Sequence, residues 1–299
     1  MAEFLLAGVE VYIWLGDVYA YLVNYIHPWE KVRYRTQYYK RTMEVVFSLL
    51  KVPTTNLHFV EESSYESTPG FLLDQYRACT LATREDVAKV SAEAAQSAVL
   101  GPSLCPILQA LAEEYLDADF QFGGLDQASH FAFAEKYVPL LGYRKRAHVA
   151  ATMLPGLAGG KMSASITDSK LNFLDDPETL RQKLRNAPCN DGAVTLNPVL
   201  ALFKDILVPI GEVQAGGLCA EAASQNGSED SPFSIAGRWK NYGEIEQQYS
   251  EGKVSGDELK SAAAEALVTF LAPLRKIYEE DGEWQMVDAH AYPDPGSDE

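Results

Sequence analysis

The first 62 residues alternate between short β-branched stretches and one long helical pattern, an order that few folds accept. Residues 8–16 (GVEVYIWLG) and 56–62 (NLHFVEE) are rich in β-branched and aromatic residues, which predicts two buried strands. Between them, residues 28–51 begin with proline, carry apolar residues at helical spacing and stop before Val52-Pro53. A strand–helix–strand unit implies parallel strands, so we expect an α/β fold built on a doubly wound sheet.

The alternation continues to about residue 155 and is then replaced by helical patterns alone. Residues 117–127 and the stretch from 148 predict two further strands, and the second of these leads into a glycine-rich loop. Residues 257–280 carry the longest amphipathic pattern of the remainder. We therefore expect a catalytic-type α/β domain at 1–155, a loop at 156–170, and an all-helical domain at 171–299 with a flexible insertion at 213–232.

The net charge of −17 limits how this chain could bind nucleic acid. Lysine and arginine contacts to phosphates supply most of that affinity, so we expect no general coating of DNA or RNA. Two local runs are candidate basic patches, although each is also compatible with an ordinary solvated face: Arg144, Lys145 and Arg146, and Arg181, Lys183 and Arg185. No stretch approaches the ~20 apolar residues that cross a bilayer, so a membrane partner is not expected.

The cysteines and histidines show no metal-ligand spacing. The four cysteines lie far apart without a C-x-x-C pair, which favours reduced thiols in a reducing, cytoplasmic compartment. None of the five histidines is spaced from another histidine or a cysteine as zinc ligands are. We expect no metal site formed by the chain itself.

The heptad GGKMSAS, Gly159 to Ser165, joins a flexible glycine pair to one lysine and two serines near the end of an expected strand. Transfer of an adenylyl group from ATP to a carboxylate leaves negative charge on the departing pyrophosphate. A lysine on a mobile loop can meet that charge as it develops, which stabilises the transition state selectively. From the heptad alone, a glycine-rich surface loop that happens to contain lysine is an equally good interpretation.

A second motif, QFGGLDQ, spans Gln121 to Gln127. Two glycines let the backbone approach a ligand closely, and the carboxylate that follows can hold ribose hydroxyls. Glycine pairs in turns are common, so the motif is weak by itself. Both motifs nevertheless follow strands of a doubly wound sheet, at the edge where such sheets bind ligands.

The run from Gln121 to Leu184, QFGGLDQASHFAFAEKYVPLLGYRKRAHVAATMLPGLAGGKMSASITDSKLNFLDDPETLRQKL, resembles the eukaryotic cytosolic tyrosyl-tRNA synthetases. Within it, KMSAS is similar to the KMSKS signature of class I aminoacyl-tRNA synthetases. The resemblance extends from EFLLAG at the start, through VYIWLGDVYAYL and LQALAEEYL, to AYPDP near the end, with 213–232 as the main exception. It implies a Rossmann-like fold followed by an anticodon-binding-like helical domain.

The resemblance also implies an ATP-dependent ligase that forms tyrosyl-adenylate and transfers tyrosine to tRNA(Tyr), with Mg²⁺ accompanying ATP. It further implies a cytoplasmic homodimer with helices near 115–142 at the interface. By the resemblance, Lys161, Ser163 and Ser165 would act on the ATP phosphates, and Lys161 and Met162 would belong to the ATP-binding loop. Gly124 and Asp126 would hold the ribose. Gln109 and Gln127 would contact the amino and carboxyl ends of the amino-acid substrate, and Asp17 would lie near its ammonium group.

Several positions depart from the family pattern. Cys105 stands where the family has a tyrosine that grips the substrate's amino group, and Ala112 where it has an aspartate that accepts a hydrogen bond from the phenol. Tyr19 replaces a histidine, and Ala164 replaces the second lysine of KMSKS. Losing the phenol's acceptor should weaken discrimination against phenylalanine, because a site rejects the hydroxyl-free analogue only when its polar groups would stay unpaired.

No His-x-Gly-His motif of the family's first active-site loop occurs in the sequence, and the strand that precedes that loop is missing with it. That strand lies in the middle of the family's parallel sheet, so its loss would leave two neighbours without a ladder partner. Either the sequence begins at an internal methionine of a longer protein, which we favour, or the sheet closes up around the gap.

Three functions stay open on these residues. The first is tyrosine activation and transfer by an incomplete or degenerate synthetase. The second is a catalytically inactive paralogue that serves as a protein- or RNA-binding module. The third is an adenylating ligase with another amino-acid specificity. Cys105 and Ala112 favour the second or third, whereas the intact KMSAS and GGLDQ motifs favour the first or third.

Overall fold

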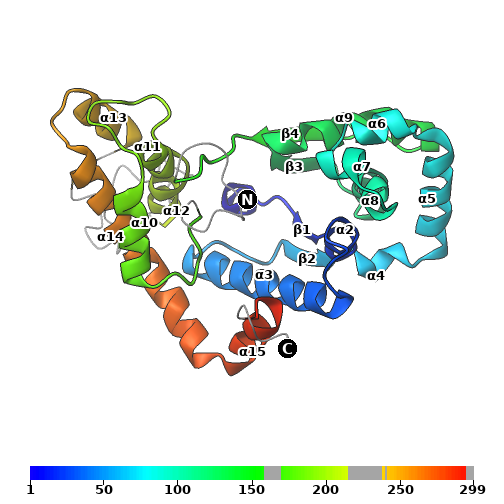
Figure 1. Cartoon of the computed structure of the whole chain (residues 1–299), viewed down its shortest axis with the longest axis horizontal. Coiled ribbons are helices and arrows are strands. Elements are labelled where there is room, and N and C mark those ends of the chain that lie inside the picture. The colour runs from blue at the N-terminus through cyan, green and yellow to red at the C-terminus, as the bar shows by residue number, and fades with distance from the viewer. Residues whose placement is uncertain (158–169, 215–237, 240, 294–299) are drawn as a thin grey trace. The chain divides into compact units, whose positions relative to one another are not determined.

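The computed structural model describes residues 1–157, 170–214, 238–239 and 241–293 (Figure 1). These residues belong to two compact units. The strand-containing unit comprises Val11–Arg41, Leu57–Met153 and Met286–Glu299, and the helical unit comprises Met1–Glu10, Thr42–Asn56 and Leu154–Gln285. Lys161, Met162, Ser163 and Ser165, and residues 215–232 of the expected insertion, lie outside the described residues.

The described strands form two parallel pairs, as Figure 1 shows. β1 (Val11–Leu15) pairs with β2 (Leu57–Glu61), and β3 (Phe120–Gly124) pairs with β4 (Ala147–Ala151). The strand–helix–strand prediction is confirmed, and so is the α/β fold class. The expected single sheet is divided, however, because β1 and β3 are not hydrogen-bonded to each other. The sheet has therefore not closed up by pairing these two strands.

Short helices surround the strand pairs, and side-chain caps define where several of them begin. The Oγ1 of Thr83 accepts a hydrogen bond from the amide of Asp86, and Thr68 and Ser91 cap two other helices in the same way. The helices are α2 (Asp17–Val23), α4 (Ser63–Glu66), α5 (Pro69–Leu81), α6 (Arg84–Ala88), α7 (Ala92–Gln96), α8 (Gly101–Tyr115), η1 (Leu125–Gln127), α9 (Ala128–Tyr137) and η2 (Pro139–Leu141).

Helix α8 forms the centre of the strand-containing unit. It packs against α2, α5 and α9, and most of its side chains are buried. Its apolar residues join one cluster with side chains from α5, α6 and α9, among them Phe71, Ile107, Leu108, Leu111, Phe133 and Tyr137. Burial of a large apolar side chain contributes about 1.5–3 kcal/mol, so this cluster holds α8 firmly beneath the strand ends.

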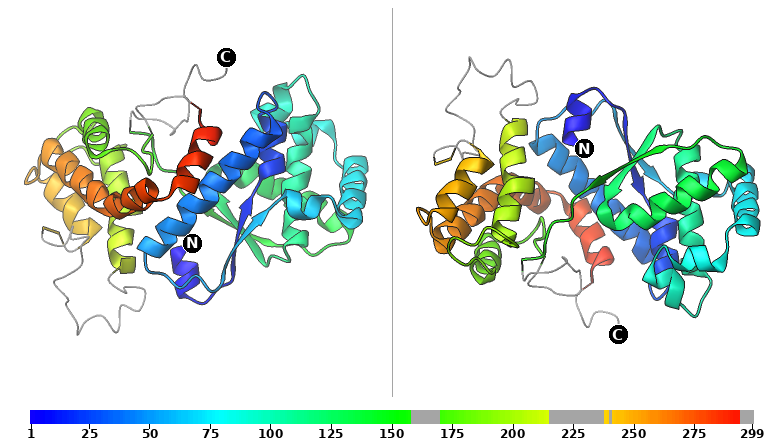
Figure 2. Two further views of the ribbon diagram at one scale, coloured as in Figure 1. Left: turned by 90° about the horizontal axis from the view of Figure 1, so that it is seen from below. Right: turned by 90° about the horizontal axis from the view of Figure 1, so that it is seen from above.

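The long helix α3 (Trp29–Leu49) contributes residues to both units. Within the strand-containing unit, its first half lies beside the end of α15 (Gly282–Ala291), as both views of Figure 2 show. The guanidinium of Arg35 donates to the carbonyl oxygen of Ala291 at 3.1 Å, and the Tyr34 ring stacks on His290 with centroids 4.5 Å apart. These contacts fix the end of α15 against α3.

The helical unit contains no strand among its described residues, as expected for the region after residue 171. Asp176, Asn197, Asn241 and Ser255 cap four of its helices with side-chain oxygens, and Ser255 forms a full capping box with Glu258. Its helices are α1 (Ala2–Leu6), α10 (Pro177–Asn186), α11 (Pro198–Leu202), the π-helical turn η4 (Phe203–Leu207), α12 (Val208–Gln214), α13 (Tyr242–Ser250) and α14 (Gly256–Glu280).

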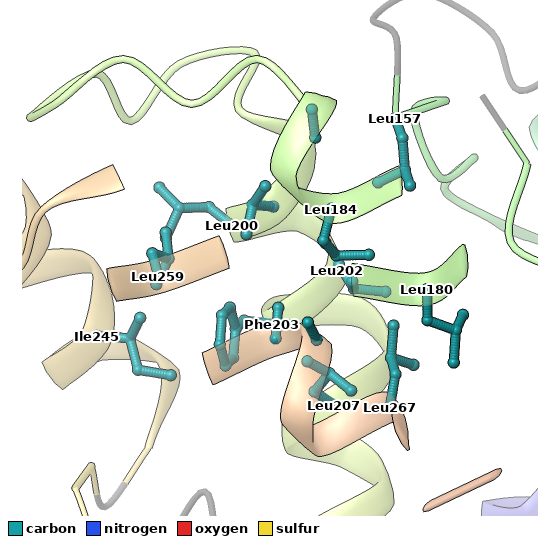
Figure 3. Close-up of a cluster of buried hydrophobic side chains, with 14 of the residues drawn as sticks. Leu157, Leu180, Leu184, Leu200, Leu202, Phe203, Leu207, Ile245, Leu259 and Leu267 are labelled. Atoms are coloured by element: carbon teal, nitrogen blue, oxygen red, sulfur yellow. The ribbon is translucent and has the colours of Figure 1, made fainter. Parts of the chain in front are cut away.

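The core of the helical unit is a continuous apolar cluster (Figure 3). Helices α10 and α14 form its largest contact, and α11 and η4 pack onto α14. Most of the side chains labelled in Figure 3 come from these helices and α13: Leu180, Leu184, Leu200, Leu202, Phe203, Leu207, Ile245, Leu259 and Leu267. Leu157, which lies outside the helices, packs against them. The amphipathic pattern at 257–280 therefore corresponds to the buried face of α14.

Within the described ranges, no helix combines the length and the apolar character that spanning a bilayer requires.

Candidate active site

Three glutamine side chains meet beside β3. Gln109 of α8 is only 6% exposed, and its Nε2 donates to the Oε1 of Gln121 at 3.0 Å and to the Oε1 of Gln127 at 3.1 Å. Gln121 lies in β3 and Gln127 ends η1, directly after the glycine pair. The structure thus brings together Gln109 and Gln127, two residues that the sequence placed at the amino-acid side of the site.

A buried polar network extends this cluster beneath β3 and β4. Gln121 Nε2 donates to Glu113 Oε1 at 3.3 Å, and the same oxygen lies 2.8 Å from His148 Nε2. The other ring nitrogen of His148 lies 3.2 Å from Glu135 Oε1, and Phe131 stacks on the imidazole. Burial raises the pKa of Glu113, although His148 opposes this shift. Satisfied buried networks of this kind hold side chains in one arrangement.

The glycine pair makes room for the carboxylate that follows it. A Cβ atom at Gly124 would lie 2.5 Å from Asp126 Oδ1 and 2.6 Å from Met153 Sδ. Real Cβ atoms do not approach other atoms so closely, so only glycine fits here while Asp126 keeps its position. Gly124 and Asp126 thus lie in direct contact, and their role at a ribose stays a prediction.

Asp17 is buried at the start of α2, where it links the ends of β1 and β2. Its Oδ1 accepts hydrogen bonds from the amides of Val18 at 3.0 Å and Ser63 at 2.9 Å, and its Oδ2 accepts from Ser63 Oγ at 2.5 Å. Both oxygens are thus engaged by the protein. Contact of Asp17 with a substrate ammonium stays a prediction.

The two pocket departures lie on the same face of α8 as Gln109. Cys105, Gln109 and Ala112 follow one another at positions i, i+4 and i+7, and all three are buried. The Sγ of Cys105 lies 3.9 Å from the carbonyl oxygen of Tyr19 in α2, and burial raises the pKa of the thiol to about 12. This cysteine is a protonated, apolar side chain at neutral pH.

Tyr19 of α2 contacts His130 of α9. The Tyr19 hydroxyl lies 3.4 Å from His130 Nε2, and the Trp14 ring packs edge-on against Tyr19. Burial raises the pKa of Tyr19 and lowers that of His130, so both are neutral near pH 7. Among the described residues, His130 Nδ1 is a buried atom without a hydrogen-bond partner.

Two buried glutamates, Glu62 and Glu66, lie at the end of β2 next to Asp17. Glu62 Oε2 accepts a hydrogen bond from the amide of Tyr19 at 2.6 Å, while Oε1 of each glutamate has no conventional donor within the described part of the chain. Burial raises the pKa of both groups, and the two neighbouring carboxyl groups also act on each other's pKa. Two buried carboxyl groups close together cannot both ionise without a large cost, so we infer that they share a proton.

Neither expected basic patch offers unpaired cations. Arg144 pairs with Asp119 at 2.9 Å, Lys145 with Glu135 at 2.8 Å, and the buried Arg146 with Glu114 at 2.6 Å. The second run is neutralised in the same way, by the pairs Arg181–Glu265, Lys183–Asp175 and Arg185–Glu178. Each run thus contains one buried cation, Arg146 or Lys183, and two more exposed ones, and all six are ion-paired.

Sequence reasoning missed Glu113, His148, Glu62 and Glu66. The hydrogen-bond partners of Glu113, His148 and Glu62 lie on other elements, so neighbouring residues do not reveal them. His148 opens an apolar strand stretch and Glu113 faces the buried side of α8, so a polar residue at a core position was the available signal.

Comparison with known proteins agrees with this architecture. Residues 1–272 match the family model described as tRNA synthetases class I (W and Y). The cytoplasmic tyrosine–tRNA ligase of Saccharomyces cerevisiae is 36% identical over 98% of this chain and 75% of its own length. The cytoplasmic tyrosine–tRNA ligase of Danio rerio is 37% identical over 99% of this chain, which spans 54% of that protein.

Solved structures show the same likeness. Tyrosyl-tRNA synthetase from Archaeoglobus fulgidus, complexed with L-tyrosine, superposes with a TM-score of 0.75 at 25% identity and covers 92% of this chain and 83% of its own. The tyrosyl-tRNA synthetase from Pyrococcus horikoshii gives a TM-score of 0.79 at 21% identity, with 96% and 83% covered, and supports the fold. The chain spans about half the length of the vertebrate relatives and three quarters or more of the others described here.

Proposed function

The chain belongs to the tyrosine–tRNA ligases, within the class I tRNA synthetases for tryptophan and tyrosine, and from that membership we propose that it activates tyrosine with ATP and transfers it to tRNA(Tyr). The observation that carries this proposal is the meeting of Gln109 and Gln127 beside Gly124 and Asp126 at the carboxyl end of β3. The residues proposed to bind the amino acid and those proposed to bind the ribose are thereby adjacent, as the joining of an amino acid to the α-phosphate of ATP would require.

The reaction needs no covalent intermediate with the enzyme. The substrate carboxylate attacks the α-phosphate of ATP, and pyrophosphate leaves. Gln109 and Gln127 would orient the amino acid, Gly124 and Asp126 would hold the ribose, and Lys161, Met162, Ser163 and Ser165 would act on the phosphates. Positioning and charge stabilisation are the main contributions of a protein to such a transfer.

Mg²⁺ would enter with ATP as part of the substrate. The described residues contain no group of three or more histidine, cysteine or acidic side chains that could hold a metal ion. Magnesium commonly binds through substrate phosphates and keeps several waters, so no such group is needed.

We propose a cytoplasmic location, which is supported by the names of the relatives, cytoplasmic tyrosine–tRNA ligases. The α/β part, expected at 1–155, would activate the amino acid, the 156–170 loop would act on the phosphates, and the helical part from 171 would contact the anticodon region of the tRNA.

A second candidate, adenylation of an amino acid other than tyrosine, is favoured by Cys105 and Ala112. Both are buried on the α8 face that carries Gln109, and neither supplies the polar group that the family places there. A phenol hydroxyl that reaches Ala112 would find a methyl group. The site therefore lacks one of the partners with which it could prefer tyrosine over phenylalanine. The third possibility is an inactive paralogue that serves as a binding module. It differs from the first two in having no amino-acid activation, so an activity measurement distinguishes it.

ATP–pyrophosphate exchange with a panel of amino acids tests these functions. We expect exchange with tyrosine and a tyrosine-over-phenylalanine ratio well below the 10⁴–10⁵ of sites that hydrogen-bond a substrate hydroxyl. Ala112→Asp is expected to raise that ratio. Exchange with a different amino acid and none with tyrosine would establish the second candidate. Silence for every amino acid would leave only the non-catalytic paralogue.

We also propose a homodimer, formed through an apolar surface of α5 and η2. Leu73, Tyr76 and Leu140 are 59%, 63% and 58% exposed, and α5 packs against η2. Leu140 belongs to the 115–142 region expected at the interface, and α5 extends that surface. Large exposed apolar side chains that cluster in this way commonly mark protein contacts, and a second copy is the partner that family membership suggests.

Charge on this surface should separate the subunits. Leu73→Glu with Tyr76→Glu is expected to convert the dimer to a monomer at micromolar concentration, as measured by sedimentation velocity. Ile26→Glu with Leu196→Glu changes two side chains that are 78% and 95% exposed elsewhere, and should leave the dimer intact. A dimer that survives the first pair of substitutions places the interface on another surface.

A further inference from the structure

Helix α3 carries an unusual concentration of positive charge for so acidic a chain. Residues 31–41 contain five of the 25 lysines and arginines in the sequence, and no acidic residue occurs between Lys31 and Met43. Arg33, Gln37 and Lys40 follow one another at positions i, i+4 and i+7, so they form one stripe along the helix, which we call the α3 stripe. Arg33 and Gln37 are exposed, and Lys40 is half-buried.

The cations of the α3 stripe differ from those of the two basic runs considered above. The two basic runs at 144–146 and 181–185 are neutralised by six carboxylates. Lys89, Lys136 and Lys253 likewise pair with acidic neighbours. Within the part of the chain that the structure describes, Arg33 and Lys40 form no ion pair, so their charge remains available to a ligand.

Other cations near the start of α3 add to the positive electrostatic potential of the α3 stripe. Burial lowers the pKa of His27, and Arg35 and Lys31 lower it further, which shows that their positive charges act in the same region. The guanidinium of Arg35 lies over the Tyr292 ring, 5.0 Å from its centroid. Tyr39, on the same helix, is 45% exposed and presents part of its ring to solvent.

We propose that the α3 stripe is an RNA-contacting surface, at which Arg33 and Lys40 bind phosphates of the RNA backbone and Gln37 lies between them. An α-helix rises 1.5 Å per residue, so Arg33 and Lys40 lie about 10 Å apart along the axis, a span of several phosphates of one strand. In a chain of net charge −17, RNA is repelled by most of the surface, so a local patch of unpaired cations decides where it can approach. The proposal rests on the proposed function only for the identity of the RNA, tRNA(Tyr).

Neutralising the stripe tests this surface. The probe is a fluorescently labelled tRNA(Tyr) transcript, with binding measured by anisotropy between 50 and 200 mM KCl. For Arg33→Gln with Lys40→Gln, we expect affinity to fall about tenfold at the lower salt and the slope of log K against log salt to shrink by about 1.4–1.8, because each of the two phosphate contacts contributes about 0.7–0.9. The matched control is Lys89→Gln with Lys253→Gln, which removes the same charge from side chains that are 63% and 67% exposed.

The outcomes are distinct. A tenfold loss and a smaller slope in the α3 variant, with little change in the control, support the surface. Equal losses in both variants would show a general charge effect and overturn it, as would unchanged binding. Anionic phosphatidylserine vesicles that bind the wild type and not the α3 variant, without any RNA binding, would assign the stripe to a membrane and reject the RNA proposal.

Amino-acid activation separates this proposal from the proposed function. ATP–pyrophosphate exchange requires no tRNA, so the α3 variant should keep the exchange rate of the wild type. RNA binding that depends on the stripe, in a protein silent for exchange, would sink the ligase function and keep the surface. Normal ATP–pyrophosphate exchange together with RNA binding that does not depend on the stripe would support the ligase function and reject the RNA-contacting surface.

Discussion

Gly124→Ala is expected to lower the efficiency of ATP use in pyrophosphate exchange about 100-fold while the protein stays folded. The added methyl would lie 2.5 Å from Asp126 Oδ1 and 2.6 Å from Met153 Sδ, so both side chains must move. Each of these atoms ends a flexible side chain, and Gly124 has an extended backbone that alanine also adopts, so the fold can absorb the change. A displacement of about 1 Å in a positioning group can cost about 10²-fold in rate.

The measurement is the exchange rate as a function of ATP concentration, together with a thermal unfolding curve. Gly282→Ala is the matched control, because a methyl there meets no atom within 4 Å. Both variants should unfold near the wild-type temperature, and only Gly124→Ala should lose activity. If Gly124→Ala uses ATP as the wild type does, Asp126 does not hold the ribose.

Glu62→Gln should stabilise the protein at alkaline pH by about 1–3 kcal/mol, the range that a buried, uncompensated polar or charged group costs. Asp17, Tyr19, Tyr65 and Cys105 surround the Glu62–Glu66 pair and all are acidic groups. Glutamine keeps an oxygen for the amide of Tyr19 and supplies a permanent N–H donor to Glu66. The variant therefore replaces the shared proton with a hydrogen bond that does not titrate.

The pH dependence follows from the direction of the shifts. Both folded-state pKa values lie above the ordinary glutamate value of 4.5, so folding favours the protonated forms. Their contribution to stability is complete below about pH 4.5 and is lost as the pH rises through the folded-state pKa values. The difference between Glu62→Gln and wild type should thus grow from pH 5 to pH 9 in urea titrations.

Glu280→Gln, which removes a charge from an exposed position at the end of α14, serves as the control and should show no such trend. A stability difference for Glu62→Gln that is constant over this range would contradict the shared proton.

The sequence predicted the regular elements well because their signals are local. β-Branched residues at 8–16 and 56–62, and the proline before α3, act within a few positions of themselves, and β1, β2 and α3 lie where they indicated. Part of the candidate site could be predicted from the sequence, since Gly124, Asp126 and Gln127 belong to one motif. The contact between Gln109 and Gln127 spans 18 positions, and the resemblance rather than the spacing placed them together.

Long-range pairings explain what sequence reasoning missed. The amide of Tyr19 reaches Glu62 across 43 positions, and Arg181 reaches Glu265 across 84, so neither neutralised patches nor buried glutamates can be recognised from neighbouring residues. The same reason hid the α3 stripe, because a cation stands out only after the partners of the other cations are known. The division of the strands into two pairs likewise depends on which strands meet in space.

The hydrogen bonds of the glutamine cluster all run in one donor-to-acceptor order. Both hydrogens of the Gln109 amide nitrogen go to oxygen atoms, one on Gln121 and one on Gln127, while Gln121 in turn donates to Glu113. The orientation of each amide is thus dictated by the next, beginning at a carboxylate that can only accept. The Oε1 of Gln127 already accepts a hydrogen bond from Gln109, so the NH₂ group of Gln127 is the donor that remains for a substrate. A substrate carboxylate would be a suitable acceptor for that group.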